Sequence, residues 1–457
     1  MHKLEGDFSI TFFYFYSSMN YKETIDYLYA MLPVFHRIGA KAFKPNLANT
    51  SKLCEYLGNP QDKFKSIHIA GTNGKGSTSH YMASILQCAG YKTGLYTSPH
   101  LKDYTERFRI NGISIDKAKV SAFVEKHKTY IEELRPSFFE LSVALAFDFF
   151  ASENVDIAVI EVGLGGRIDS TNIIHPELSI ITNIGFDHMD VLGDTLPKIA
   201  FEKAGIIKPN TPIVISERNG QTSPVFLEKA QQENAPIYFA EDNYMVKEVN
   251  SPAINTLKLV VDVIDKNSNK IYENLTSELI GPYQLKNLGG VIQSVEVLRE
   301  LGFNIPDEAL RNGIAQVCTL TGLKGRWQIL DYKPLTICDT GHNEHGLNIV
   351  LNQISKLSET GVIKGDKYFI LGFVKDKDVE KILQLFPKEA KYYFCQADSP
   401  RSMPPENLIK IAESIGITGY SILSVNDALK KVRENASSND FIYIGGSTFV
   451  VAELDEL

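Results

Sequence analysis

Residues 67–77 read Ile-His-Ile-Ala-Gly-Thr-Asn-Gly-Lys-Gly-Ser, and this stretch decides the fold of the first half of the chain. Its β-branched start predicts a buried strand, its three glycines a tight loop, and the spacing of residues 77–89 a helix. Backbone N–H groups at such a helix start attract anions, and Lys75 adds a full positive charge. The stretch therefore predicts a phosphate-binding loop, with Ser77 placed to reach an associated Mg²⁺ ion.

This loop differs in spacing from the common G-x-x-x-x-G-K-[ST] pattern. Position 69 is Ile rather than Gly, and Gly76 separates Lys75 from Ser77. An ordinary glycine-rich turn between a strand and a helix is the alternative. We favour the phosphate loop because the lysine and the hydroxyl both fall where a phosphate and its metal need them.

Length and composition describe a globular protein of two or three domains. The 457 residues are 44% hydrophobic and 22% charged, with a net charge of −8 and a pI near 5.8. This balance argues against a broad nucleic-acid-binding surface, although it allows a local basic pocket. Five scattered cysteines without a CxxC motif predict reduced thiols in a cytoplasmic protein rather than disulfides or a zinc site.

The first 18 residues are predicted to be an extension without function. Residues 9–18 are apolar and aromatic but too short to span a bilayer. Glu5 and Asp7 and the lack of a small-residue cleavage site argue against a signal peptide. An amphipathic stretch begins at Tyr21, so we expect the folded part to start near residue 19 and to need no membrane.

Strand-like runs alternate with helical patterns, which predicts a parallel sheet with helices on both faces. Ligands bind such sheets at the carboxyl ends of the strands. The first group of expected strands is 66–70, 92–96, 156–161, 178–184 and 212–216, and the expected helices are 77–89, 116–134, 140–151 and 196–205. Four short runs at 237–239, 244–249, 256–263 and 270–272 predict an antiparallel appendage, followed by a helix at 284–301.

Residues 318–325 contain two glycines and no periodicity, which predicts a linker. The alternation restarts after it, with expected strands at 335–338, 368–371, 391–395, 420–423 and 441–444 and helices at 345–357, 379–385, 405–415 and 425–435. The predicted class is α/β: a P-loop-type, doubly wound, mostly parallel sheet domain over residues 19–317 with a small antiparallel β appendage. A second, smaller Rossmann-like α/β domain covers residues 326–457.

Three candidate residues follow strands or lie on a helix near them. Glu161 ends a strand before a glycine-rich turn and could hold Mg²⁺, or it could pair with Arg167. His188 could ligate a metal through a neutral ring nitrogen or be structural. Lys203 could be a snorkelling side chain, an ion-pair partner of Glu202, or a neutral amine that reacts with CO₂ to form a carbamate.

A further group lies on both sides of the linker. Asn287 is on a helix, Arg326 follows Gly325, and Asp339-Thr-Gly-His-Asn343 ends a strand and opens a helix. Each residue alone could be a cap or a surface group. Together they place polar groups on both sides of one cleft, which predicts a nucleotide bound between two domains.

The motifs at 67–77 and 159–174 resemble the two signature patterns of the folylpolyglutamate synthase and dihydrofolate synthase family, relatives of the Mur ligases. The resemblance extends over about residues 20–457 in a matching order. Further similar motifs are Tyr96-Thr-Ser-Pro-His-Leu101, Thr105-Glu-Arg107, Ile110-Asn-Gly112, Ser137-Phe-Phe-Glu140, Glu202-Lys-Ala-Gly-Ile206, Lys375-Asp-Lys-Asp378, Pro400-Arg401 and Gly445-Gly-Ser447.

The resemblance implies roles for individual residues. Lys75, Lys203 and His342 would be catalytic. ATP would contact Thr72, Asn73, Gly74, Lys75, Gly76, Ser77, Asn287, Arg326 and Asp339. Ser98, Glu161, His188 and carbamylated Lys203 would hold two Mg²⁺ ions, with K⁺ as a further ion. Phe139, Glu140, Ile168, Asp169 and Ser170 would line the pterin side, and His342 and Ser447 would lie near the incoming glutamate.

The implied activity is an ATP-dependent amide ligation of L-glutamate to dihydropteroate, to a folate, or to both, through an acyl phosphate. The resemblance also implies a monomer in the cytoplasm that binds neither nucleic acid nor membrane. Two alternatives are a Mur-type ligase for cell-wall precursors and a nucleotide-binding regulator without catalysis. The sequence departs from the family pattern at residues 38–50, at Tyr283 in place of a usual His, and at Glu344 in place of a usual Pro.

Overall fold

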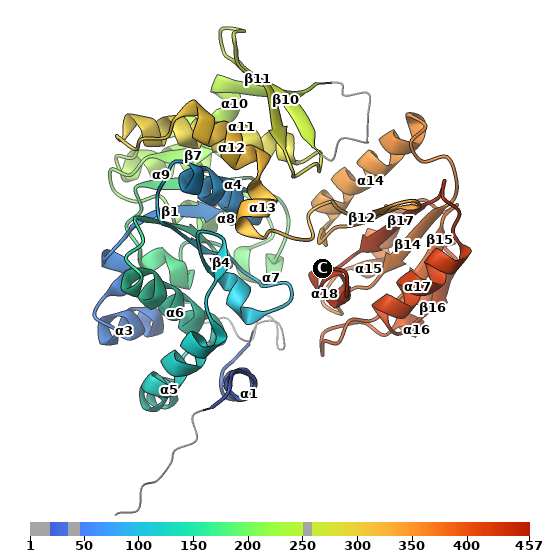
Figure 1. Ribbon diagram of the computed structural model, residues 1–457, viewed down its shortest axis with the longest axis horizontal. Helices are drawn as coiled ribbons and strands as arrows, with labels where there is room; N and C mark the ends of the chain where they lie inside the picture. Colours follow the sequence, from blue (N-terminus) through green and yellow to red (C-terminus); the bar gives the residue numbers. More distant parts are fainter. Residues whose placement is uncertain (1–18, 35–45, 250–257) are drawn as a thin grey trace, which may run out of the picture.

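The computed structural model describes residues 19–34, 46–249 and 258–457. The expectations for residues 1–18 and for residues 38–45 lie outside this part of the chain. The described elements form two lobes side by side (Figure 1). The N-terminal lobe contains the elements from α1 to α13, and the C-terminal lobe contains those from β12 to α18.

An eight-stranded sheet forms the centre of the N-terminal lobe, in the order β4-β3-β2-β5-β1-β6-β7-β8. The six strands from β2 to β8 in this order are parallel, and β3 and β4 form an antiparallel hairpin at one edge. The strand bounds are β1 (Lys65–Ala70), β2 (Thr93–Tyr96), β3 (Phe108–Ile110), β4 (Ile113–Ser114), β5 (Ile157–Glu161), β6 (Leu178–Ile181), β7 (Ile213–Ile215) and β8 (Ile237–Phe239). The predicted α/β class and parallel sheet are confirmed.

Helices cover both faces of this sheet, as the alternating pattern predicts. Their bounds are α1 (Tyr21–Met31), α3 (Ala48–Tyr56), η2 (Pro60–Asp62), α4 (Lys75–Cys88), η3 (Tyr104–Arg107), α5 (Lys117–Leu134), α6 (Phe138–Ser152), η4 (Ser170–Ile173), α7 (Met189–Leu192), α8 (Leu196–Ala204), α9 (Ser223–Gln232), α10 (Ala240–Asn243), α11 (Gln284–Glu300), α12 (Asp307–Ala315) and α13 (Val317–Thr321). Side chains of each strand alternate between the two faces. Val159 packs in a core with α4 and α11, whereas Ile160 packs in a second, aromatic core with α6.

Helix α4 is buried on all sides. Every residue from Ser77 to Leu86 is buried, and the helix contacts α11, α12, α13 and the sheet. A helix that buries its whole circumference needs neighbours on every face. The N-terminus of α4 is therefore fixed by the packing of the entire lobe.

The predicted antiparallel appendage is confirmed as the three-stranded sheet β11-β10-β9, at the top of Figure 1. Its strands are β9 (Tyr244–Glu248), β10 (Leu259–Asp265) and β11 (Lys270–Ser277). The assignment of residues 237–239 to this appendage is wrong, because β8 pairs in parallel with β7 at the edge of the large sheet. A three-residue apolar run carries no signal that separates a parallel edge strand from an antiparallel one.

The C-terminal lobe contains a six-stranded sheet in the order β12-β13-β17-β14-β15-β16, parallel except for the edge strand β12. Its strands are β12 (Gln328–Tyr332), β13 (Leu335–Cys338), β14 (Lys367–Leu371), β15 (Lys391–Phe394), β16 (Gly419–Ser421) and β17 (Phe441–Gly445). Its helices are α14 (Glu344–Glu359), α15 (Val379–Leu383), α16 (Pro405–Ser414), α17 (Val425–Asn435) and α18 (Thr448–Glu453). The expected linker at 318–325 begins inside α13, so its first four residues are helical.

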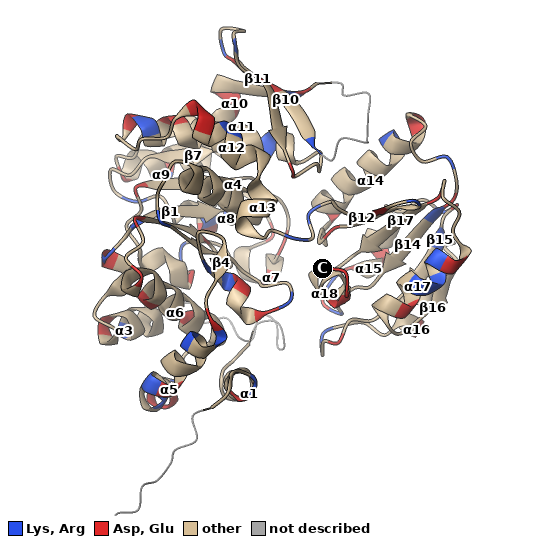
Figure 2. Ribbon diagram, in the orientation of Figure 1, with Lys and Arg blue, Asp and Glu red and all other residues tan. Residues whose placement is uncertain are grey.

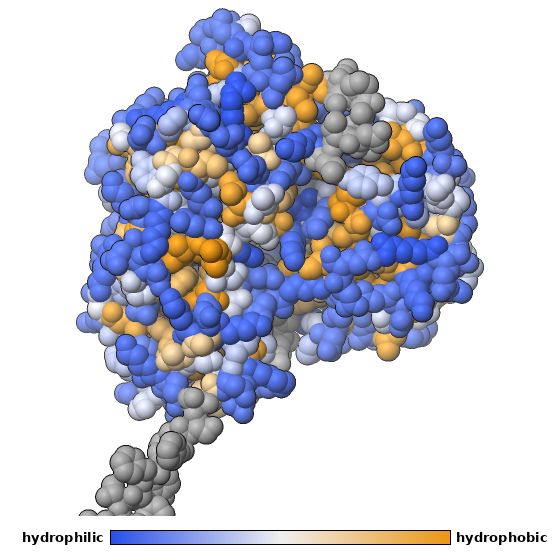
Figure 3. Space-filling model, viewed as in Figure 1, coloured by the Kyte–Doolittle hydropathy of each residue, from blue (hydrophilic) through white to orange (hydrophobic). Residues whose placement is uncertain are grey.

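The surface carries charges of both signs. Figure 2 shows Lys and Arg interspersed with Asp and Glu over the helices of both lobes. The face in Figure 3 is mostly hydrophilic and is hollowed where the two lobes meet. Across residues 19–34, 46–249 and 258–457, no helix combines the length and the apolar character needed to cross a membrane.

The close contact between α12 and α4 generates a prediction about stability. A Cβ atom at Gly313 would lie 2.5 Å from Cα of Ile85, which is buried backbone and cannot move aside. We expect Gly313→Ala to lower the free energy of unfolding by about 1–3 kcal/mol in urea titrations. Gly220→Ala is the matched control, because a Cβ there meets no atom within 4 Å. Equal stability of the two variants would contradict this account of the packing.

Candidate active site

The glycine loop (residues 71–74) connects β1 to α4 at the carboxyl end of the sheet. Gly74 is the N-cap of α4 at φ +84°, and no side chain in the described part of the chain caps the helix there. The first N–H groups of α4 therefore remain available to a ligand. Lys75 Nζ donates hydrogen bonds to the carbonyl oxygens of Gly71 at 3.1 Å and Thr72 at 3.2 Å, so its charge lies directly over the loop.

Gly74 also has a steric reason to be glycine. A Cβ atom at this position would lie 2.3 Å from Oδ1 of Asn287, which is on the first turn of α11. The glycine loop and Asn287 are therefore packed against each other, as the sequence prediction of a common site requires.

A first cavity of about 470 Å³ opens at this loop and is bounded by both lobes. The residues predicted to contact ATP all line it, together with Ser98, Glu161 and His342. These residues are Thr72, Asn73, Gly74, Lys75, Gly76, Ser77, Asn287, Arg326 and Asp339.

Asp339 and Arg326 belong to the C-terminal lobe and line this cavity. Asp339 accepts hydrogen bonds from the backbone N–H of Trp327 at 2.6 Å and of Gly341 at 2.7 Å. Tyr283, at the residue before α11, donates its hydroxyl to Asp339 at 2.8 Å. Tyr283, which stands where the family pattern usually has His, therefore links the two lobes.

Glu161, the last residue of β5, is a buried acid in the wall of the first cavity. It accepts a hydrogen bond from the N–H of Ser98 at 3.3 Å, and it forms no ion pair with any described residue. The alternative pairing with Arg167 is excluded, because Arg167 pairs with Glu202 at 2.9 Å. Burial raises the pKa of Glu161 to about 7, and the charges of Lys75 and Arg326 only partly offset this effect.

Lys203 lies in the last turn of α8 and is buried. Its Nζ donates to the carbonyl oxygen of Gly71 at 2.9 Å, behind the glycine loop. Glu202 forms its ion pair with Arg167, so the predicted alternative of a Lys203–Glu202 ion pair is wrong. Burial, reinforced by the charge of Lys75, lowers the pKa of Lys203 to about 7. A substantial fraction of the amine is therefore neutral and nucleophilic near pH 7.

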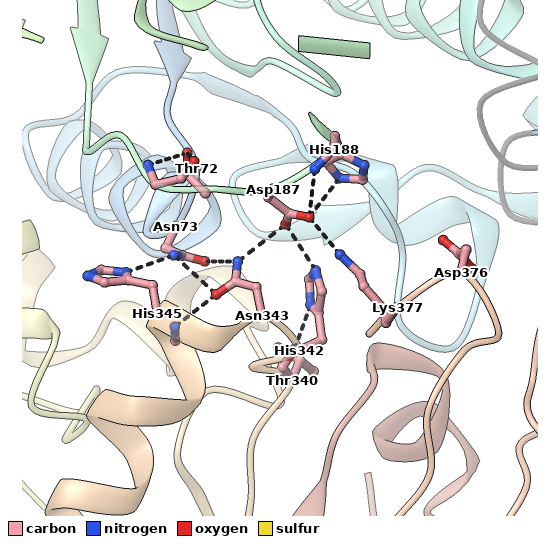
Figure 4. Close-up of polar contacts among 12 residues, drawn as sticks. Thr72, Asn73, Asp187, His188, Thr340, His342, Asn343, His345, Asp376 and Lys377 are labelled. Atoms are coloured by element: carbon pink, nitrogen blue, oxygen red, sulfur yellow. Dashed lines mark hydrogen bonds and ion pairs between the residues drawn. The ribbon is translucent and has the colours of Figure 1, made fainter. Parts of the chain in front are cut away.

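His188 and Asp187 follow β6 and lie at the contact between the lobes (Figure 4). Burial lowers the pKa of His188 to about 4 despite the opposing charge of Asp187, so the ring is neutral at pH 7. Burial alone would raise the pKa of Asp187, but its contacts with His342, His188 and Lys377 hold that pKa well below its usual range.

A second cavity of about 310 Å³ lies on the other side of His342. Its walls include Pro33, Val34, Phe138 and Phe449, which make them largely apolar. The residues predicted for the pterin and glutamate sides all line this cavity, together with His188. These residues are Phe139, Glu140, Ile168, Asp169, Ser170 and Ser447.

The two acids of the second cavity are held by backbone N–H groups. Glu140 accepts a hydrogen bond from the N–H of Ser137 at 2.5 Å, which completes the capping box of α6. Asp169 accepts from the N–H of Leu164 at 2.8 Å and of Thr171 at 3.0 Å. Both carboxylates therefore fix the loops that shape the cavity.

The two cavities share one wall. The residues that line both are Ser98, Pro99, His100, Leu101, His342 and Thr448, and we call this set the shared wall. A group bound at the glycine loop and a group bound in the second cavity would meet there. His342 Nδ1 faces the carbonyl oxygen of Thr340 at 3.1 Å, which orients the ring at this junction.

Comparisons with known proteins agree with this geometry. Residues 69–295 match the Mur ligase middle domain, and residues 325–448 match the Mur ligase glutamate ligase domain. The chain is 33% identical over 421 residues to the dihydrofolate synthase/folylpolyglutamate synthase of Bacillus subtilis (strain 168), which covers 90% of this chain and 94% of that protein. The chain belongs to the dihydrofolate synthase/folylpolyglutamate synthase family.

Solved structures of the family share the fold. Escherichia coli FolC in complex with DHPP and ADP is similar with a TM-score of 0.81 and 27% identity, over 95% of this chain and 96% of that one. The bifunctional folylpolyglutamate synthase/dihydrofolate synthase of Yersinia pestis, complexed with AMPPNP and a Mn ion, gives a TM-score of 0.78 and 26% identity, over 95% of this chain and 97% of that one.

The candidate metal ligands of this family member do not form a complete site by themselves. In the described part of the chain, no three His, Cys, Asp or Glu side chains cluster as a metal site. Glu161, His188 and Lys203 instead lie around Lys75, whose charge affects the pKa of each. This arrangement fits Mg²⁺, which usually takes one or two protein ligands and completes its shell with phosphates and water.

Several residues that line the two cavities were assigned no role from the sequence. In the first cavity, Lys286 Nζ lies 2.5 Å from Glu217, and Asn183 donates to Glu217 at 3.3 Å. Glu217 follows β7, so its place at a strand end is the signal that could have identified it. In the second cavity, Lys377 and Arg401 come from the C-terminal lobe. Their motifs belong to the resemblance, but only the structure brings them to the site.

The raised pKa of Glu161 predicts a pH dependence of metal binding. If Glu161 is a metal ligand, a divalent cation competes with the proton for this carboxylate, and the affinity for the cation falls as the pH decreases below about 7. We expect the apparent dissociation constant for Mg²⁺, measured in the presence of a non-hydrolysable ATP analogue, to rise by up to about tenfold per pH unit there. Glu161→Gln should bind the ion weakly and lose this dependence. A pH-independent affinity in the unmodified protein would exclude Glu161 as a ligand.

Proposed function

We propose that this chain is an ATP-dependent ligase that joins L-glutamate to dihydropteroate and to reduced folates. The observation that carries the proposal is the meeting of two cavities at the shared wall. One cavity opens at the N-terminus of a buried helix beside Lys75, the other is largely apolar, and His342 lines both. A triphosphate and a flat aromatic acid placed in them would bring a phosphoryl group and a carboxylate together.

The first cavity is the proposed ATP site. Free N–H groups of α4 and the charge of Lys75 suit the phosphates. Asn287, Arg326 and Asp339 would contact the rest of the nucleotide from both lobes. The related E. coli and Y. pestis structures, which contain ADP and AMPPNP, support a nucleotide in this family.

The second cavity is the proposed acceptor site. Its apolar walls suit a bicyclic pterin, and we assign Phe139, Glu140, Ile168, Asp169 and Ser170 to that side. We assign Ser447, together with His342, to the side of the incoming glutamate. The name of the B. subtilis relative, which covers both synthase activities, supports two acceptors for this one cavity.

The proposed reaction has two steps. A carboxylate oxygen of the acceptor attacks the γ-phosphorus of ATP, the bond to the bridging oxygen breaks, and ADP leaves an acyl phosphate behind. The amine nitrogen of L-glutamate then attacks the acyl carbon, inorganic phosphate leaves, and the nitrogen loses a proton. Lys75 and the first N–H groups of α4 stabilise the charge on the transferring phosphoryl group. Contact between the lobes excludes water, which would otherwise hydrolyse the acyl phosphate.

Divalent cations complete the proposed site. When bound, they would neutralise phosphate charge and act as Lewis acids. Ser98, Glu161 and His188 would hold Mg²⁺, and carbamylated Lys203 would help to hold a second ion. The buried carboxylate of Glu161, which forms no ion pair with any described residue, and the neutral ring of His188 support these assignments. K⁺ as a further ion is part of the proposal without assigned residues.

The remaining expectations belong to the same proposal. We propose a nucleotide-binding domain over residues 19–317, a linker at 318–325 and a glutamate ligase domain over 326–457, with residues 1–18 as an extension without function. The two matched domain families and the two separate sheets support this division. We further propose a cytoplasmic monomer.

An assay of acceptors tests the proposed function. With ATP, Mg²⁺ and L-glutamate, we expect amide products and ADP from dihydropteroate and from tetrahydrofolate.

Lys75→Ala should lower turnover by about 10²–10³-fold or more, because the positive charge that stabilises the transferring phosphoryl group is lost. Lys198→Ala, on the exposed side of α8, is the matched control and should retain activity. Product only from a cell-wall nucleotide precursor would favour a Mur-type ligase, and ATP binding without glutamate-dependent ADP release would favour a regulator.

The low pKa of Lys203 predicts a carbamate. A neutral amine forms a carbamate with CO₂, so the modified fraction should increase as the pH rises through about 7. We expect a lysine carbamate signal in the ¹³C NMR spectrum of the protein with ¹³C-bicarbonate. Lys203→Arg should lack that signal and most of the activity. Full activity in bicarbonate-free buffer, with no carbamate signal, would contradict the assignment.

A further inference from the structure

Asp187 belongs to the N-terminal lobe, but three of its side-chain contacts come from the C-terminal lobe (Figure 4). Its Oδ1 lies 2.6 Å from Nζ of Lys377. Its Oδ2 accepts a hydrogen bond from Nδ2 of Asn343 at 3.2 Å and lies 3.6 Å from Nε2 of His342. We call these four residues the Asp187 clasp.

The Asp187 clasp differs from an ordinary ion pair at a lobe contact. The side chains of Asp187 and Lys377 are only 10% and 20% exposed. A second ion pair between the lobes, Lys356 with Glu248, is 58% and 46% exposed at 3.4 Å. Exposed pairs are screened by solvent and contribute little, whereas a shielded pair with several hydrogen bonds holds its partners in one geometry.

The Asp187 clasp also connects to the glycine loop. Asn343 caps the start of α14, where its Oδ1 accepts from the N–H of Gly346 at 2.8 Å. Nδ2 of Asn343 also lies 3.0 Å from Oδ1 of Asn73, and Nδ2 of Asn73 lies 3.1 Å from Nδ1 of His345. One carboxylate thus holds the start of α14 against the proposed phosphate site.

His342 is the member of the clasp that belongs to the shared wall, and Lys377 lines the second cavity. Asp187 is not among the described residues that line either cavity. Its effect on the site would therefore pass through its partners. If the clasp opened, His342 and the start of α14 would lose their common anchor on the N-terminal lobe.

We propose that Asp187 is a positioning residue for amide formation, which docks the C-terminal lobe and holds His342 at the shared wall. This inference rests on the proposed function. Its chemical consequence concerns the acyl phosphate, whose acyl carbon is attacked either by the amine of glutamate or by water. Attack by water releases the acceptor carboxylate and phosphate, so ATP is consumed without product. A docked lobe favours the amine over water.

Asp187→Asn is the first test, because the amide has nearly the same shape but no charge for Lys377. The measured quantity is the phosphate released per amide bond formed, with saturating ATP, dihydropteroate and L-glutamate. The unmodified protein should give a ratio near one. We expect the ratio to rise several-fold in Asp187→Asn. A variant that is merely less stable would lower both rates and leave the ratio unchanged.

Lys377→Met tests the same contact from the other lobe and keeps the proposal testable if Asp187→Asn fails to fold. Lys377 also lines the second cavity, so the double variant is needed to separate the two roles. If Lys377 acts through Asp187, the double variant should have the same ratio as the single variants. Additive effects would show that Lys377 acts on the substrate independently.

Lys356→Met, which removes the exposed ion pair between the lobes, is the matched control and should keep a ratio near one.

Small-angle X-ray scattering of the full-length chain, with and without the ATP analogue, gives a second readout that does not require turnover. We expect a larger radius of gyration for Asp187→Asn and Lys377→Met than for Lys356→Met and the unmodified protein. An unchanged ratio together with an unchanged radius of gyration would overturn the inference. If the unmodified protein made no amide with any acceptor, the proposed function would fail, and the scattering comparison would still decide whether Asp187 docks the lobes.

Discussion

The rest of the structure depends on the burial of residues 77–86 of α4. Its packing against the sheet and against α11, α12 and α13 fixes the helix from all sides, so its N-terminus cannot shift without disturbing the core. That N-terminus has no side-chain cap and opens into the first cavity. The core of the lobe therefore holds a set of unsatisfied N–H donors in one place, and the neighbouring strands bring Glu161 and Asp187 to either side of it.

Burial also sets the charges around Lys75. It raises the pKa of Glu161 to about 7 and lowers that of Lys203 to about 7 and that of His188 to about 4. Each shift moves a group toward its neutral form, so the site holds less charge than its residue types suggest. This property fits the polyphosphate and divalent cations of the proposed reaction.

The sequence predicts those features that depend on local spacing. The strand, loop and helix at residues 65–88 are formed as expected, and Glu161 and His188 lie near the same edge because parallel strands end there. The β3–β4 hairpin and the parallel pairing of β8 were not predicted, because two- and three-residue strands carry too little periodicity. The Asp187 clasp joins residues 187, 342, 343 and 377, and its contacts depend on how the two lobes dock. No local pattern contains that information, although each of its members lies in a recognisable motif.

The shared wall has a thermodynamic consequence. The segment from Ser98 to Leu101 faces both cavities, so a ligand that shifts it from one side alters the shape met by a ligand on the other. Linkage then requires reciprocity: the factor by which one molecule changes the affinity for its neighbour equals the factor in the opposite direction. If a ligand in one cavity shifts this segment, the two binding equilibria are coupled, and the affinity for either occupant depends on whether the other is present.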